Sequence, residues 1–138
     1  MGRVTTTITV TNHIDEILAD RGLWERDRVR SITLTNVLVD TGATRLCLPA
    51  EIVRQLGLTL AGEIRGHTVI GNRSFRLFEN VKLAIAGRQG RYDCIELPEG
   101  EEAIVGLIPL EDMGLELDLQ AARLVTLPDR GRDNYLRV

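Results

Sequence analysis

Three residues whose types and spacing could support catalysis follow the apolar run at 37–39. They are Asp40, Thr41 and Gly42. This run has the composition of a buried strand, and a buried strand rarely ends on an unpaired carboxylate. Gly42 permits a sharp turn because glycine tolerates a positive φ, and the Thr41 hydroxyl can cross-link a loop. A carboxylate held in such a turn is suited to general acid or base chemistry. The alternative is an ordinary strand end, because Asp and Gly are common in turns.

The other reactive side chains give weaker signals. Cys47 and Cys94 lack Cys-x-x-Cys spacing and stand among apolar neighbours, which favours reduced, buried thiols. His13 and His67 are far apart, and neither belongs to a cluster with zinc-binding spacing. The sequence therefore predicts no metal ion and no cofactor. A cysteine hydrolase that uses Cys47 with His67 is a competing hypothesis, although an apolar setting disfavours a thiolate.

Alternating apolar residues and turn signals predict a chain made mostly of strands. The expected elements are a strand at 4–11, a helix at 14–21, strands at 29–34, 37–39 and 46–48, a helix ending at Gly57, strands at 68–70, 75–78, 81–85 and 92–97, an apolar run at 103–107, and a hairpin at 115–119 and 124–127. Asn36 is expected to kink the chain before Asp40, and the Gly71–Asn72 pair is expected to form a hairpin turn. A weak internal repeat is also visible, because the apolar runs that end at Gly42 and Gly106 are each followed by a proline and a Gly-Leu pair.

With these elements in order, the chain resembles the retropepsin-like aspartic proteases over roughly residues 29–127. The residues that carry the resemblance are the Asp-Thr-Gly-Ala motif at 40–43, the Leu-Pro pair at 48–49 and the apolar-apolar-Gly element at 104–106. The resemblance implies a closed, mostly antiparallel β-barrel lobe with one or two short helices. The expectation is a single domain over 1–138, with its core at 29–127 and with the strand at 4–11 and the tail at 128–138 at the periphery.

The resemblance also implies roles for individual residues. Asp40 is expected to be the catalytic carboxylate, with Thr41, Gly42 and Ala43 supporting its loop, Ile70, Gly71, Asn72 and Arg73 forming a flap over the substrate, and Ile104, Val105 and Gly106 packing beside the active-site loop. Two carboxylates held close together share one proton, so that one activates water and the other donates to the scissile carbonyl. Because the motif occurs once, the resemblance implies a homodimer with one Asp40 from each chain.

Two departures from the family pattern stand out. Thr44 and Arg45 follow Ala43, where the family often has an acidic residue or Ser, and Leu107 follows Gly106, where Arg or Asp is frequent. An alternative function is therefore a binding or assembly module that keeps the fold and is catalytically weak or silent. The complete Asp-Thr-Gly-Ala motif argues against this alternative, because a close carboxylate pair is costly to maintain.

Composition excludes several other classes of protein. The 138 residues carry a net charge of −3 and only 4% aromatic residues, which argues against a nucleic acid partner. No apolar run is long enough to span a bilayer, and the N-terminal residues lack the apolar core of a signal peptide. The expectation is a cytoplasmic protein with a protein or peptide substrate and no membrane contact.

Overall fold

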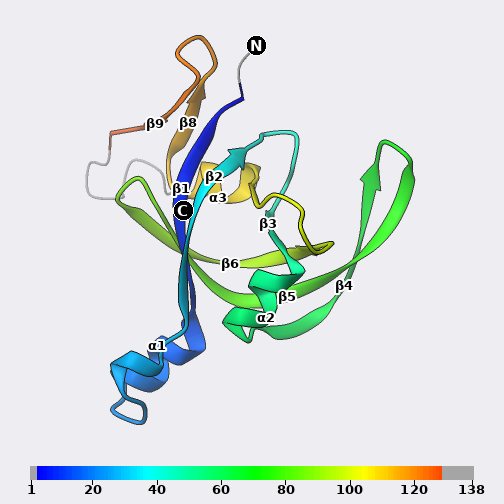
Figure 1. Ribbon diagram of the computed structural model, residues 1–138. Helices are drawn as coiled ribbons and strands as arrows, with labels where there is room; N and C mark the ends of the chain where they lie inside the picture. The colour runs from blue at the N-terminus through cyan, green and yellow to red at the C-terminus, as the bar shows by residue number, and fades with distance from the viewer. Residues whose placement is uncertain (1–2, 129–138) are drawn as a thin grey trace, which may run out of the picture.

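The computed structural model describes residues 3–128 and shows a closed ring of strands from which a long hairpin projects (Figure 1). The ring contains, in spatial order, β1 (Thr5–Asn12), β2 (Ser31–Val39), β7 (Ile104–Val105), β3 (Leu46–Pro49), β6 (Arg88–Leu97) and β5 (Gly71–Ile85). It closes because β1 pairs with β5 as well as with β2. β4 (Thr59–Thr68) continues the sheet beyond β5. Only the β2–β7 and β3–β6 pairings within the described residues are parallel, so the mostly antiparallel β lobe is confirmed.

Short helices occupy the connections between the strands. They are α1 (His13–Asp20) and the 3-10 helix η1 (Arg26–Arg28) between β1 and β2, α2 (Ala50–Leu56) after β3, and α3 (Leu107–Asp112) after β7. As predicted, α2 begins after Pro49 and ends at Gly57, which takes the left-handed conformation with φ of 62°. A separate two-stranded sheet, β8 (Leu115–Asp118) with β9 (Arg123–Thr126), follows α3 and matches the expected final hairpin.

The N-terminal strand is one of the strands that form the ring, whereas residues 4–11 were expected at the periphery. β1 is hydrogen-bonded to β2 on one side and to β5 on the other, and Ile8 and Val10 are fully buried. The alternating pattern shows that one face of this strand is apolar, but it does not show that both edges are paired. Of the tail expected at 128–138, residues 129–138 lie outside the described part of the chain.

Two predicted features of the β4–β5 hairpin also differ in detail. The predicted strands at 75–78 and 81–85 form one strand, β5, in which Asn80 has a φ of 66° at a bulge. The hairpin turn consists of Val69 and Ile70, because Thr68 pairs directly with Gly71. The predicted Gly71–Asn72 turn is therefore wrong by two residues. Gly71 and Asn72 instead lie in β5, where they pair with Thr68 and His67 of β4. The pairs along the whole hairpin fix this register.

An ion pair between the buried Asp15 carboxylate and the partly exposed Arg30 anchors the segment between β1 and β2. The side-chain oxygen of Asn12 accepts from the backbone N–H of Asp15, and the Asn12 amide donates to the carbonyl of Leu56 at 2.8 Å. Arg30 donates to the Asp15 carboxylate from its backbone N, Nε and Nη2, at 2.8–3.0 Å. These bonds hold α1 against the carboxyl end of α2, and they bury the Asp15 carboxylate on the inner side of α1.

The charge state of Asp15 follows from these contacts. Burial alone would raise the pKa of this carboxyl group, but the hydrogen bonds and the positive charge of Arg30 outweigh burial and hold the pKa below its usual value. A carboxyl group whose folded-state pKa is lowered stabilises the fold above its unfolded-state pKa. That contribution is lost as the pH falls through the folded-state value.

We expect Asp15→Asn to lower the free energy of unfolding by about 1–3 kcal/mol at pH 7, because it weakens three charge-assisted hydrogen bonds. Urea denaturation at pH 7 and at pH 3 measures the effect, and the difference from the parent protein should shrink at the lower pH. Asp20→Asn is the matched control, because Asp20 lies on the same helix as Asp15, and its exposed pair with Arg26 of η1 should contribute little. Equal effects of the two substitutions would contradict the structural role of Asp15.

Candidate active site

Asp40 lies directly after the end of β2 and is held by the backbone of its own loop. Its N–H donates to the carbonyl of Val105 at 3.1 Å, and its carbonyl accepts from Ala43 N–H at 3.1 Å, which closes the turn. The N–H of Gly42 donates to Asp40 Oδ1 at 2.8 Å. The Asp40 carboxylate is therefore oriented without help from another side chain in the described residues, and it remains partly open to solvent.

The predicted element at 104–106 lies beside this loop. β7 is inserted between β2 and β3, and the backbone N–H groups of Leu107 and Ile108 donate to the carbonyls of Ala43 and Thr44 at 2.8 and 2.9 Å. A Cβ atom at Gly106 would lie 2.5 Å from the carbonyl oxygen of Arg45 and 2.7 Å from that of Ala43. Glycine is required at 106 because the two backbones touch there.

The two faces of the sheet differ in burial, and Asp40 belongs to the more open face. On the closed face, paired positions carry the buried side chains Val39, Val105, Leu46, Cys94 and Phe78. The residues next to these in each strand point to the opposite face. There, paired apolar side chains form a set that we call the apolar row: Leu38, Ile104, Cys47, Ile95 and Leu77. All of these except Cys47 are half-buried.

Asp40 stands two residues after Leu38, so its side chain shares the face of the apolar row. The row crosses β2, β7, β3, β6 and β5 in spatial order and leads to the projecting hairpin. Beyond Leu77, the cross-strand pair Ile64–Phe75 continues this face onto the hairpin. The carboxylate thus stands at one end of a continuous apolar surface.

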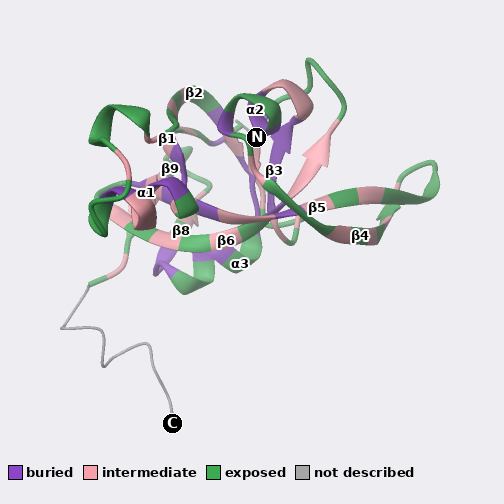
Figure 2. Cartoon of the chain, turned by 90° about the horizontal axis from the view of Figure 1, so that it is seen from below, coloured by how far each residue is buried: buried purple, intermediate pink, exposed green. Residues whose placement is uncertain are grey.

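The predicted flap residues lie at and beside the tip of the β4–β5 hairpin, which projects away from the ring (Figure 1). Ile70 is in the turn, and Gly71, Asn72 and Arg73 open β5. Ile70 is 83% exposed, and the neighbouring Val69 is fully exposed. Figure 2 shows the contrast between this exposed hairpin end and the buried strands of the ring. An apolar tip with no covering surface in the described chain is suited to contact with another molecule.

Cys47 is unreactive in this setting. Burial, together with a smaller effect from the negative charge of Asp40, raises the pKa of its thiol to about 11. The thiol is therefore protonated at neutral pH. The predicted alternative partner, His67, lies on the hairpin with its Nδ1 2.9 Å from Asn72 Oδ1. The geometry gives no support to a Cys47–His67 hydrolase, and the described residues contain no cluster of three or more potential metal ligands.

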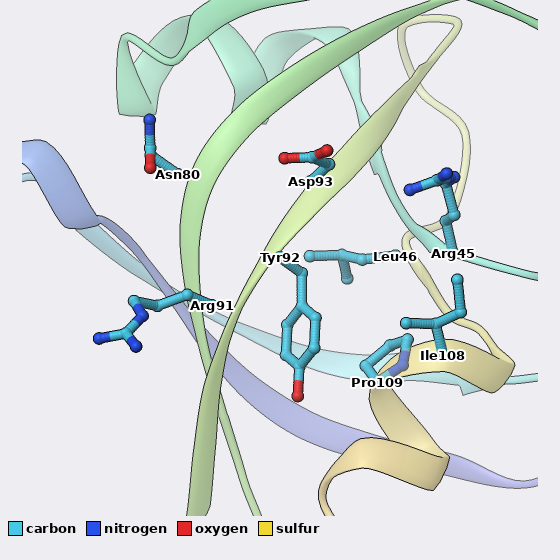
Figure 3. Close-up of a pocket in the computed structure, with 8 residues that line it drawn as sticks. All are labelled: Arg45, Leu46, Asn80, Arg91, Tyr92, Asp93, Ile108 and Pro109. Carbon is cyan, nitrogen blue, oxygen red and sulfur yellow. The ribbon is translucent and has the colours of Figure 1, made fainter.

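A cavity of about 280 Å³ opens at the exit of the Asp40 loop (Figure 3). Asp40 is not among its lining residues, which are Arg45, Leu46, Asn80, Arg91, Tyr92, Asp93, Ile108 and Pro109. The cavity touches the loop through Arg45 and through Ile108, whose N–H is bonded to the Thr44 carbonyl. Sequence reasoning noted Arg45 only as a departure from the family pattern, and it missed both the cavity and the apolar row.

Comparison with known families agrees with this geometry. A family model described as aspartyl protease matches residues 29–108, which include the Asp40 loop, the hairpin and Gly106. The chain belongs to the aspartyl protease family. Within it, the match is to a retropepsin-like family of clan AA, as the resemblance implied. No curated protein matches the chain.

Among residues 3–128, no helix has the length and apolar character needed to cross a membrane.

We expect iodoacetamide at pH 7 to leave Cys47 unmodified in the folded aspartyl protease on the time scale on which a free thiol reacts, because the raised pKa leaves almost no thiolate. Mass spectrometry of digested protein measures the extent of labelling. The same reaction after unfolding in urea is the control, and it should modify both Cys47 and Cys94. Fast labelling of Cys47 in the folded state would restore the cysteine hydrolase hypothesis.

Proposed function

We propose that this aspartyl protease is an endopeptidase that acts as a homodimer, with one Asp40 carboxylate from each chain. The observation that carries the proposal is the position of Asp40, held by backbone hydrogen bonds on the open face of the sheet beside Gly106. The Asp-Thr-Gly motif occurs once in the chain, and a twofold axis beside the loop would bring two copies together.

The chemistry follows from the proximity of two like charges. Two carboxylates a few Å apart do not both ionise readily, so the pair holds one proton between them. The ionised member takes a proton from a water molecule, while the protonated member donates to the carbonyl oxygen of the scissile peptide bond. The water attacks the carbonyl carbon and forms a tetrahedral diol. The C–N bond then breaks, one hydroxyl of the diol returns its proton to the pair, and the leaving amine takes up a proton from the pair. This mechanism needs neither a metal ion nor a cofactor.

The neighbouring residues would support this arrangement. The Thr41 side chain is exposed and available to form a hydrogen bond with the loop of the partner. Gly42 and Ala43 are small, so the backbone beside the carboxylate can approach the partner and the substrate closely. A Cβ atom at Gly42 would lie 3.1 Å from Asp40 Oδ1. The hairpin with Ile70, Gly71, Asn72 and Arg73 would close over an extended peptide laid along the apolar row and exclude water. We further propose that residues 1–138 act as one domain and that the enzyme works in the cytoplasm.

Asp40→Asn should abolish peptide hydrolysis, with a loss of at least a thousandfold in kcat, because an amide cannot act as the base. Its effect on stability should be small, since the amide fills the same space on a half-exposed site. Cleavage of a mixed peptide library followed by mass spectrometry measures activity, and Asp27→Asn on the exposed η1 helix is the control. Undiminished cleavage by the Asp40 variant would exclude the aspartic mechanism. A parent protein that binds peptides without cleaving them would favour the binding module.

Activity should belong to the dimer. When the Asp40→Asn chain is mixed with an equal amount of parent chain and allowed to exchange, about a quarter of the dimers retain both carboxylates under random pairing. Activity per parent chain should then fall to roughly half, whereas addition of the Asp27→Asn chain should cause no loss. The measurement is a titration at fixed parent concentration, with exchange verified by native mass spectrometry. A flat response with demonstrated exchange would mean that each chain acts alone.

A further inference from the structure

Arg45 lies on the open face of the sheet, level with Asp40. The parallel pair Leu46–Cys94 puts the preceding residues, Arg45 and Asp93, side by side on the face that carries Cys47 and Ile95. β7 alone separates the strand of Asp40 from the strand of Arg45. Arg45 is therefore the cation that borders the apolar row on the side of the catalytic loop, and its side chain is half-buried there.

The cavity beside Arg45 combines an apolar floor with charges that are not neutralised. Leu46, Ile108 and Pro109 supply apolar surface, and Tyr92 is turned away from the charged rim by its hydrogen bond to Asp112 Oδ2 at 2.5 Å. The rim carries two guanidinium groups, Arg45 and Arg91, and one carboxylate, Asp93. Among residues 3–128, none of these three groups forms an ion pair within 4.0 Å. Figure 3 shows Arg45 and Asp93 on one side of Leu46, Tyr92 and Pro109 on the other, and the guanidinium of Arg91 directed away from both groups.

We propose that Arg45, at the edge of this cavity on the open face of the sheet, forms a substrate subsite and binds an acidic side chain of the peptide. The proposal rests on the endopeptidase function given above and adds a substrate class to it. Arg45 has no ion-pair partner among residues 3–128, so its charge is available to an anion, and a half-buried guanidinium can donate two hydrogen bonds to a carboxylate. Asp93, on the neighbouring strand, carries the charge that opposes a bound anion.

The geometry also fixes where the acidic residue must stand in the substrate. Adjacent strands are about 4.8 Å apart, so a position two strands from Asp40 lies roughly 10 Å away. An extended peptide advances about 3.3 Å per residue. The acidic side chain should therefore be about three residues from the scissile bond, with apolar residues between. In a twofold dimer this requirement holds on both sides of the bond.

The test uses fluorescence-quenched peptides that share an apolar centre and differ only at the third residue from the scissile bond, which is Glu, Gln or Lys. The parent enzyme should show the highest kcat/KM for Glu and the lowest for Lys, with the Glu peptide about tenfold better than the Gln peptide, as expected for one charge-assisted contact. Arg45→Gln should abolish the difference between Glu and Gln, and Arg45→Glu should make Lys the preferred residue. Arg45→Lys should retain the original order, because it retains the charge.

Two controls separate this site from general effects of charge. Arg123→Gln removes an arginine from β9 in the separate small sheet and should leave the preference unchanged. Asp93→Asn removes the opposing carboxylate and should increase the preference for Glu. A preference for Glu that survives Arg45→Gln, or a parent enzyme that prefers Gln or Lys, would overturn the proposal.

A binding measurement distinguishes failure of the subsite from failure of the proposed function. The Asp40→Asn protein, with and without Arg45→Gln, is titrated with fluorescein-labelled versions of the same peptides, and anisotropy reports Kd. Tighter binding of the Glu peptide that is lost with Arg45→Gln supports the subsite even if the parent protein cleaves none of the peptides, in which case the endopeptidase proposal alone fails. Equal binding of all three peptides overturns the subsite and leaves the catalytic proposal untouched.

Discussion

The fold depends on the close backbone contact between the Asp40 loop and the residues around Gly106. β7 is only two residues long, yet it lies between β2 and β3, which are consecutive in the chain. The loop that joins β2 to β3 must therefore pass over the end of β7, and its carbonyl groups accept hydrogen bonds from the residues that follow Gly106. A side chain at 106 would separate these backbones, so the absence of a Cβ atom fixes both the crossing and the orientation of the carboxylate.

The rest of the lobe supports this crossing. β1 closes the ring between β2 and β5, and the N–H of Val39 donates to the carbonyl of Val4 directly before the catalytic loop begins. α2 packs its buried side chains Ile52, Val53 and Leu56 into the core below β3. The Asn12 amide, bonded to the Leu56 carbonyl, fastens the start of α1 to the end of α2, and the Asp15–Arg30 pair holds the segment between β1 and β2 together. Elements far apart in sequence thus hold the strand that presents Asp40.

Local features could be predicted from the sequence, and features set by pairing partners could not. The Asp40 turn, the helix between Pro49 and Gly57 and the short element at 104–106 each depend on residues close together in the chain, and the structure contains all three. The central position of β1 depends on pairing with residues at least 20 positions away in β2 and at least 69 positions away in β5, which no local pattern encodes. The apolar row escaped prediction for the same reason, because its members come from five strands. The hairpin turn was misplaced because composition suggested a turn at Gly71, whereas the cross-strand pairs decide the register.

The continuity of β5 has a mechanical consequence. Residues 81–85 are hydrogen-bonded on both sides, to β1 and to β6, whereas residues 71–76 have only β4 as a partner. One half of the strand is therefore held along both edges, and the other half is held along one edge only. The part of β5 that is paired on both edges begins at Leu77, which pairs with β4 and with β6, and the bulge at Asn80 lies just inside it. Bending should concentrate at this boundary, so that the hairpin swings as a stiff arm while the strands that carry the carboxylate stay in place.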